Sequence, residues 1–296
     1  MGQRVRIVSL LPGATEMLVA LGAADRLVGI SHECDYPESV QHVPRVTTTP
    51  IDPSRSSAEI DRMVREASAE GRAVIAIDAE QLRALQPDLL VTQVLCDVCA
   101  VADGEAHRLA AVLDPPPRVV ALGGRTLQGV WDDILALGAA IGVEGAASRV
   151  VAELESDVAA LRARFARPDP VPVVVIEWLA PCFLAGHWTP DLIAAAGGVD
   201  LGARPGDHSV GREWSDVLAL DPTLVVIALC GFDEARARAE LAAFDHPAFH
   251  AWLAERDVLV LDGNALTSRP GPRLVEAIAR IGEATARTPR MVDDQV

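Results

Sequence analysis

The residues of this sequence that could do chemistry gather in short segments that follow predicted buried strands. One segment is Ser31-His32-Glu33-Cys34-Asp35-Tyr36, which holds the only tyrosine. Another holds the single C-x-x-C pair, Cys96 and Cys99, and two later ones hold Glu177-Trp178 and Gly186-His187-Trp188. Imidazoles and thiols are metal ligands, and indole rings pack on flat apolar groups. These residue types therefore favour binding of a metal or of a flat metal-containing ligand.

The thiols offer an alternative, a metal or redox centre. His32, Cys34, Cys96 and Cys99 follow strands that should be neighbours, and four soft ligands of this kind suit zinc or iron. A four-cysteine zinc ribbon is excluded because there is no second C-x-x-C. Asp97 would raise the pKa of its neighbouring thiols, which opposes a thioredoxin-like role. We rank plain buried thiols above a metal site at Cys34, Cys96 and Cys99, and leave both open.

Several enzyme classes are excluded. All 26 basic residues are arginines, so P-loop, pyridoxal-phosphate and Schiff-base chemistry lack their lysine. The segment Asp207–Gly211 departs from a nucleophile elbow because its first residue is not glycine. No G-x-G-x-x-G follows the first predicted strand, and no pair of carboxylates stands out as acid and base. We therefore predict a protein that is not an enzyme. An enzyme acting on a cobamide or haem derivative stays as a distant alternative.

Charge and the amino-terminal sequence bear on partners and location. The 42 acidic residues give a formal net charge of -16, which argues against nucleic acid and acidic membranes as partners. No apolar run is long enough for membrane insertion. The run Val5–Leu11 is interrupted by Pro12-Gly13, so no secretory signal is seen. Together with five cysteines expected to be reduced, this predicts a cytoplasmic protein. If the start site is placed too far downstream, the protein is extracytoplasmic.

Strands and helices alternate in two parts of the chain, which is typical of parallel sheets covered by helices. Between them, residues 127–165 carry helical spacing without a strand, with a break expected near Gly142 and Gly145. The predicted strands are Val5–Leu11, Leu27–Ser31, Val74–Ile77, Leu89–Val94 and Val119–Leu122 in the first part, and Val173–Trp178, Leu224–Leu229 and Val258–Leu261 in the second.

An internal similarity supports two related halves. Leu82–Val91 and Val217–Val226 both read as a helix end, a proline and a buried strand. The fold class expected is α/β, with two Rossmann-like lobes whose parallel sheets are joined by a long helical segment. We expect the lobes to meet only through that segment. The domains are residues 1–125 for the first lobe, 126–168 for the connecting helices and 169–296 for the second lobe.

Ligands of open parallel sheets bind beyond the carboxyl ends of the strands. The turn at Pro12-Gly13 opens a helix whose free N–H groups could hold an anion. Reading the other strand ends in the same way gives the complete set of candidate ligand-binding residues: Pro12, Gly13, Ser31, His32, Tyr36, Glu177, Trp178, His187, Trp188, Asn264 and Arg269.

The residues that carry a family resemblance are Ile7–Glu16, Asp25–Ile30, Pro87-Asp88-Leu89 and Ser268–Arg273. In these motifs the whole chain resembles the substrate-binding proteins of cobalamin and iron-siderophore ABC transporters. The resemblance implies two α/β lobes bridged by a long helix, with the ligand clamped between them and only a small hinge motion. Segments 32–37, 96–99 and 186–188 are similar to a subgroup labelled cobalamin-binding that lacks export signals.

The function predicted from the sequence is that of a non-enzymatic clamp for a corrinoid, or for a related tetrapyrrole or iron chelate. The corrinoid would be the ligand, and no cofactor is required. His32 or His187 could coordinate the metal of the chelate as a neutral imidazole. An ABC permease is an expected partner only if the protein is exported.

Overall fold

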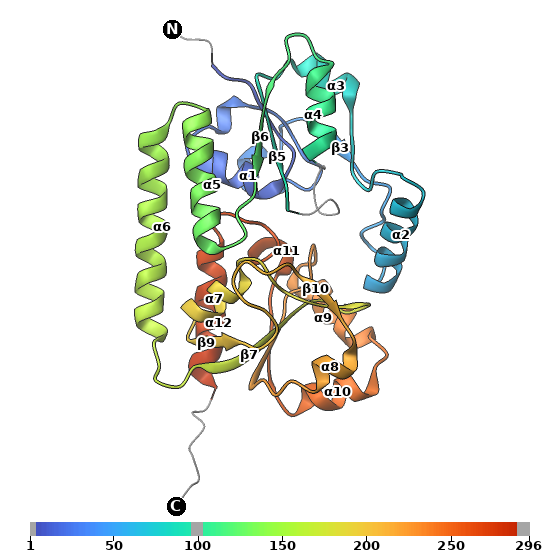
Figure 1. Ribbon diagram of the computed structural model, residues 1–296, viewed down its shortest axis with the longest axis vertical. Coiled ribbons are helices and arrows are strands. Elements are labelled where there is room, and N and C mark those ends of the chain that lie inside the picture. The colour runs from blue at the N-terminus through green and yellow to red at the C-terminus, as the bar shows by residue number, and fades with distance from the viewer. Residues whose placement is uncertain (1–3, 96–102, 289–296) are drawn as a thin grey trace, which may run out of the picture.

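The computed structural model describes residues 4–95 and 103–288, and Figure 1 shows them as two α/β lobes. The first lobe holds a four-stranded sheet in the order β2-β1-β5-β6, and all of its pairings are parallel. Its central strands β1 and β5 are buried along their whole length, as expected of aliphatic runs covered on both faces. The strands are β1 (Ile7–Ser9), β2 (Leu27–Ile30), β5 (Leu89–Gln93) and β6 (Arg118–Leu122).

The α-helices described in the first lobe are α1 (Pro12–Ala20), α2 (Ser57–Ala69), α3 (Ala79–Leu85) and α4 (Asp103–Ala111). Two short strands, β3 (Thr47–Thr48) and β4 (Ala76–Ile77), pair antiparallel outside the main sheet. The strand expected at Val74–Ile77 is therefore shorter than predicted and does not join the parallel sheet. Together β3 and β4 form the base of an excursion that carries α2 away from the lobe (Figure 1).

Two antiparallel helices, α5 (Leu127–Ala140) and α6 (Glu144–Phe165), follow the first lobe and run side by side along one edge of the molecule (Figure 1). The chain turns between them at Gly142, whose φ of +71° is accessible to glycine at little cost. The predicted helical segment and its break are confirmed, although Gly145 lies inside α6.

The second lobe holds a six-stranded sheet in the order β10-β8-β7-β11-β12, with β9 also paired to β7. Its strands are β7 (Val171–Trp178), β8 (Cys182–Leu184), β9 (Gly198–Asp200), β10 (Val210–Arg212), β11 (Leu224–Ile227) and β12 (Asp257–Val260). The helices are α7 (Thr189–Ala195), α8 (Trp214–Leu218), α9 (Glu234–Ala243), α10 (Pro247–Ala254), α11 (Gly263–Leu266) and α12 (Leu274–Arg287).

The parallel part β9-β7-β11-β12 repeats the order of β2-β1-β5-β6 in the first lobe. The two segments with similar sequence supply β5 and β11, which occupy equivalent places. The α/β fold with two lobes joined by helices is thus confirmed. One correction is needed, because β8 and β10 pair antiparallel and make the second sheet mixed.

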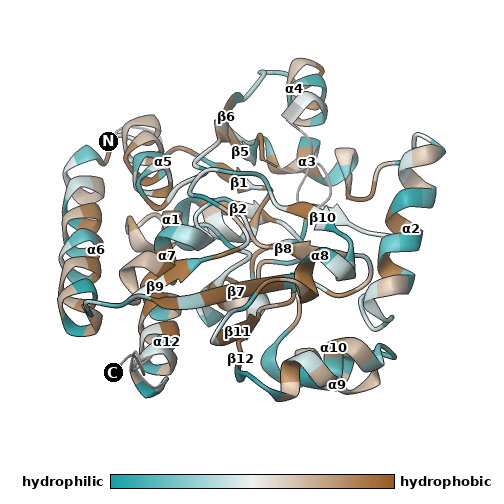
Figure 2. Ribbon diagram, turned by 60° about the horizontal axis from the view of Figure 1, so that its bottom comes forward, coloured by the Kyte–Doolittle hydropathy of each residue, from teal (hydrophilic) through white to brown (hydrophobic). Residues whose placement is uncertain are grey.

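The lobes share more than the helical connection. One hydrophobic cluster runs from Ile7 in the first sheet through Ile134 of α5 and Val158 of α6 to Val173 in the second sheet and Ile281 of α12. Outside these helices, Gly13 of the first lobe lies against Pro270 of the second, where a Cβ on Gly13 would be 2.3 Å from the Pro270 carbonyl oxygen. The expectation that the lobes meet only through residues 127–165 is therefore wrong. Figure 2 shows hydrophobic residues concentrated on β7, whereas α2 and α6 carry hydrophilic residues along their lengths. The domain limits at 125/126 and 168/169 stay a prediction.

The burial of the Asp200 carboxyl, at the end of β9, leads us to predict that the stability of the protein depends on pH. Asp200 Oδ1 accepts hydrogen bonds from the N–H groups of Gly202 (2.7 Å) and Ala203 (3.3 Å), whereas its buried Oδ2 has no partner among the described residues. Burial raises the pKa of this carboxyl to about 6. The folded state therefore holds a proton that the unfolded state has released, and stability falls as pH rises from about 4 to about 6.

We expect Asp200→Asn to raise the free energy of unfolding by about 1–2 kcal/mol at pH 8, where wild-type Asp200 is ionised, and to leave it unchanged near pH 4. Urea unfolding at both pH values measures this difference. Asp216→Asn, at an exposed position on α8, is the control and should not reproduce the gain expected for Asp200→Asn at pH 8. An equal gain for Asp200→Asn at both pH values would contradict the prediction.

Candidate ligand-binding cleft

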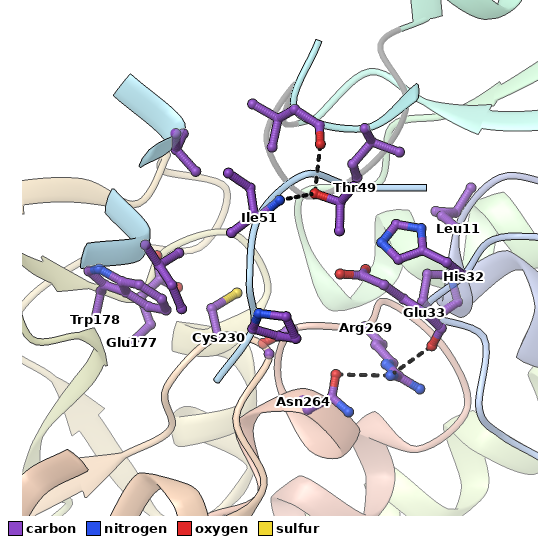
Figure 3. A pocket seen from close by; sticks show the side chains of 18 of the residues that line it. Leu11, His32, Glu33, Thr49, Ile51, Glu177, Trp178, Cys230, Asn264 and Arg269 are labelled. Atoms are coloured by element: carbon purple, nitrogen blue, oxygen red, sulfur yellow. Dashed lines mark hydrogen bonds between the residues drawn. The ribbon is translucent and has the colours of Figure 1, made fainter. Parts of the chain in front are cut away.

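A cleft of about 400 Å³ lies between the two lobes, and with its open mouth it spans about 1550 Å³ (Figure 3). Its first-lobe wall comes from the start of α1, the loop after β2 and residues 49–75, and its second-lobe wall from the ends of β7 and β11, from α9 and from the α11 region. The carboxyl ends of parallel strands from both sheets thus converge on one space, which is where open α/β sheets bind ligands.

Seven of the eleven predicted binding residues line this cleft: Pro12, Gly13, His32, Glu177, Trp178, Asn264 and Arg269. Position 13 requires glycine because of its neighbour in the other lobe: a Cβ on residue 13 would lie 2.3 Å from the carbonyl oxygen of Pro270. Only glycine allows this approach of the second lobe to the first turn of α1. The two lobes are therefore in direct backbone contact at the floor of the cleft.

The structure places the other four predicted residues away from the cleft lining. Ser31 is buried behind it and accepts a hydrogen bond from Thr47 Oγ1. Tyr36 is 48% exposed, and the guanidinium of Arg273 lies over its ring. Trp188 is buried and donates from Nε1 to the carbonyl oxygen of Thr267 at 2.9 Å. His187 packs beside Trp188 and His208.

His32 has the best-defined surroundings of the cleft residues. Its backbone N–H donates to Thr47 Oγ1 at 2.9 Å, and its Nδ1 lies 2.7 Å from the same oxygen. The Thr47 hydroxyl donates onward to Ser31 Oγ at 3.2 Å, so it accepts from Nδ1–H, which leaves Nε2 as the unprotonated nitrogen. Nε2 is covered and has no hydrogen-bond partner among residues 4–95 and 103–288. Burial lowers the pKa of His32, which favours the neutral imidazole.

Charge in the cleft centres on Arg269 and Glu33. Arg269 is 6% exposed and donates from Nη2 to the Glu33 carbonyl oxygen (3.1 Å) and to Asn264 Oδ1 (2.9 Å), while it also pairs with the Asp35 carboxylate. The Glu33 carboxyl faces the cleft (Figure 3), and loss of hydration there raises its pKa although Arg269 opposes the shift. The guanidinium charge is thus balanced by the protein itself, and the Glu33 side chain is left to contact a ligand.

The cysteines do not form a metal site in the described structure. No group of three or more His, Cys, Asp or Glu side chains is placed to hold a metal within residues 4–95 and 103–288. Cys34 is buried, contacts Thr15 Oγ1 at 3.1 Å, and burial raises the pKa of its thiol to about 11, so it is not a thiolate. Cys96 and Cys99 lie outside the described residues. The alternative of zinc or iron at Cys34, Cys96 and Cys99 therefore has no support.

The largest set of cleft residues that the sequence did not predict lies in residues 49–75. The apolar ones are Ile51, Ile60, Val64, Val74 and Ile75. Ile60 and Val64 stand one helical turn apart on α2 and are only partly buried, so both face the cleft. The amphipathic pattern of α2 was visible in the sequence, but the pattern does not say what the apolar face covers. Phe183, Cys230 and Arg236 were missed as well.

Comparison with known proteins agrees with this architecture. The family model described as periplasmic binding protein matches residues 7–239. The chain belongs to the periplasmic binding protein family. A vitamin B12-binding protein of Vibrio cholerae is 22% identical over 93% of this chain and 87% of its own length. The resemblance noted in the sequence is thereby confirmed.

Solved structures of periplasmic binding proteins share the fold. The periplasmic vitamin B12 binding protein of Vibrio cholerae superposes with a TM-score of 0.66 at 21% identity, over 95% of this chain and 96% of that chain. A periplasmic heme binding protein from Pseudomonas aeruginosa gives a TM-score of 0.72 at 22% identity, over 97% of this chain and 95% of that one.

Family membership corrects one prediction and confirms another. Periplasmic binding proteins are extracytoplasmic, so the prediction of a cytoplasmic protein is wrong. They are the substrate-binding proteins of ABC transporters and not enzymes, so the prediction of a non-enzymatic protein is confirmed. Among the described residues, no helix combines the length and the apolar character needed to cross a bilayer.

Proposed function

We propose that this periplasmic binding protein holds a corrinoid, such as cobalamin or cobinamide, in the cleft between its lobes. The observation that carries the proposal is the pairing of an aromatic platform with an apolar wall. Trp178 at the end of β7 lines the cleft and packs edge-on against buried Phe232, with ring centroids 5.4 Å apart. Ile60 and Val64 of α2 also line the cleft. A flat macrocycle that enters this space can bury apolar surface on both walls.

The polar groups of the cleft suit a ligand with amide side chains. Glu33, Gln93 and Asn264 line it beside Arg269, whose charge is already paired with Asp35. A carboxylate accepts hydrogen bonds from the N–H groups of neutral amides, and a side-chain amide both accepts and donates them. A corrinoid carries such neutral amides around its rim. The net charge of -16 disfavours strongly anionic chelates through long-range repulsion. The similarity to a vitamin B12-binding protein supports the same ligand class.

His32 is the residue of the cleft wall best prepared to coordinate a metal. The hydrogen bond from its Nδ1–H to Thr47 orients the ring and fixes the tautomer, as a hydrogen bond to the other ring nitrogen does for metal-bound histidines. Because Nε2 is covered, coordination requires a local shift of the ring. His187, the other candidate, does not line the cleft in the described structure. We further propose that the loaded protein delivers its ligand to an ABC permease.

Titration of the purified protein with aquocobinamide, aquocobalamin and hemin, followed by calorimetry and visible absorption, tests the ligand class. We expect both corrinoids to bind and hemin to bind at least tenfold more weakly, an energy difference of about 1.4 kcal/mol. Aquocobinamide has exchangeable axial water, so coordination by His32 should shift its spectrum, and His32→Ala should remove the shift. His187→Ala is the control and should keep it. Tighter binding of hemin than of both corrinoids would overturn the proposed ligand.

A further inference from the structure

The cleft is covered on one side by a segment that belongs to the first lobe but touches the second. This segment, residues 49–75, is called the arm here. It leaves and rejoins the first lobe through the β3–β4 pair, and Figure 1 shows its helix α2 at the edge opposite α5 and α6. Ala67, near the end of α2, is buried in the core cluster of the first lobe. The arm therefore has one firm attachment.

The other end of α2 rests on the second lobe through a few contacts. The backbone N–H of Ser57, in the first turn of α2, donates to Glu240 Oε1 of α9 at 2.7 Å. Arg236 of α9 donates from Nη2 to the carbonyl oxygen of Arg55 at 2.9 Å. Ile60 packs against the hydrophobic cluster of the second lobe. A carboxylate at a helix N-terminus is favourable, but two hydrogen bonds and one half-buried side chain make a small attachment.

On the other side of the cleft the lobes are held much more firmly. Arg273 forms a bidentate pair with Glu16 of α1, with Nε–Oε2 and Nη2–Oε1 distances of 2.8 and 2.5 Å. Gly13 lies against Pro270, and Arg269 of the second lobe pairs with the Asp35 carboxylate of the first. The hydrophobic cluster shared by both lobes runs behind these contacts. Separating the lobes would expose this core and leave Glu16 without its partner Arg273. Lifting the amino-terminal half of α2 breaks the contacts of Arg55, Ser57 and Ile60 with the second lobe.

We propose that the arm is the lid of the cleft: ligand enters and leaves when the amino-terminal half of α2 detaches from α9, while the two lobes keep their relative position. The lid is also part of the binding surface, because Ile60 and Val64 line the cleft and are only partly buried without a ligand. The apolar face of a bound ligand would cover these two side chains and so favour the closed position of the arm. This inference rests on the proposed binding function and assigns its gate.

The test compares rate constants for aquocobinamide in stopped-flow absorption for wild type and Glu240→Ala. Loss of the Ser57–Glu240 hydrogen bond should raise the population of the open arm on the order of tenfold. Association and dissociation rate constants should both rise by about that factor. The dissociation constant should change less than threefold, because the bond is lost in free and loaded protein alike. Glu234→Ala, on the same helix but paired with Arg238 instead of the arm, is the matched control.

Two results would overturn the lid. One is Glu240→Ala with wild-type rate constants. The other is a faster association of ligand in Arg273→Met, which weakens the contact between the lobes at Glu16. A readout without ligand separates this proposal from the ligand class: in the free protein, Glu240→Ala should speed amide hydrogen exchange in Ser57–Glu66 and leave β1 and β7 unchanged. If neither cobinamide nor hemin binds, that exchange experiment still decides whether the arm opens.

Discussion

Arg273→Met is expected to lower the free energy of unfolding by about 3–5 kcal/mol, the largest effect of any single substitution considered for this protein. The partner left behind, Glu16, has only 3% of its side chain exposed and accepts both hydrogen bonds of the bidentate pair. Arg269 cannot replace Arg273, because its Nη1 is 3.6 Å from Glu16 and is also engaged by Asp35. A buried carboxylate without its main partner is costly because nothing replaces the lost hydration.

Urea unfolding followed by circular dichroism measures this loss. The control is the pair Glu16→Gln with Arg273→Met, which removes both charges; we expect it to recover at least about 2 kcal/mol relative to Arg273→Met alone. A loss below about 1 kcal/mol, or one unaffected by Glu16→Gln, would show that this pair does not hold the lobes.

Trp178→Ala is expected to weaken corrinoid binding about 30- to 150-fold, or about 2–3 kcal/mol, with little loss of stability. Trp178 is only partly buried in the free protein, and its ring packs on Phe232 at an interplanar angle of 73°. Arg236 covers Phe232 with its guanidinium 3.4 Å from the ring centroid. The indole is thus held in place before ligand arrives, so binding costs little side-chain entropy.

Calorimetric titration with aquocobinamide measures the loss. Trp178→Phe keeps an aromatic face and should retain most of the affinity. Trp214→Ala changes a partly buried tryptophan that packs on Phe249, away from the cleft, and should leave the dissociation constant unchanged. An equal loss for Trp178→Ala and Trp214→Ala would mean that the effect is one of stability rather than of contact with the ligand.

The sequence predicts those cleft residues that directly follow buried strands. Val171–Ile176 is a continuous apolar run, so the end of this strand and the position of Trp178 are well defined. His32 is placed in the same way by β2. His187 and Trp188 were grouped with Trp178 as residues that follow the Val173–Trp178 strand, but a further strand lies between, the three-residue antiparallel β8. Its carboxyl end lies at the opposite end of the sheet, so the segment after it does not reach the cleft.

Contacts between distant parts of the chain could not be predicted. Glu16 and Arg273 are 257 residues apart, and neither lies in a pattern that names its partner. The arm shows the same limit, because the apolar stripe of α2 indicates burial without telling whether core or ligand covers it. Parallel pairing was predicted correctly for β1 and β11, whose neighbouring strands are connected through helices. It was wrong for β8 and β10, because a short return of the chain gives no periodic signal in the sequence.

The pairing of Glu16 with Arg273 also has a consequence for the order in which the chain folds. Glu16 lies in the first helix of the first lobe, and its partner follows 257 residues later in the chain. Until the second lobe is in place, α1 lacks this ion pair and the first-lobe part of the shared hydrophobic cluster stays uncovered. The last helix, α12, packs against α6 and α7 and brings Arg273 with it. The two halves are therefore poor candidates for dissection into separately stable pieces, and the final step of folding is the one that joins them.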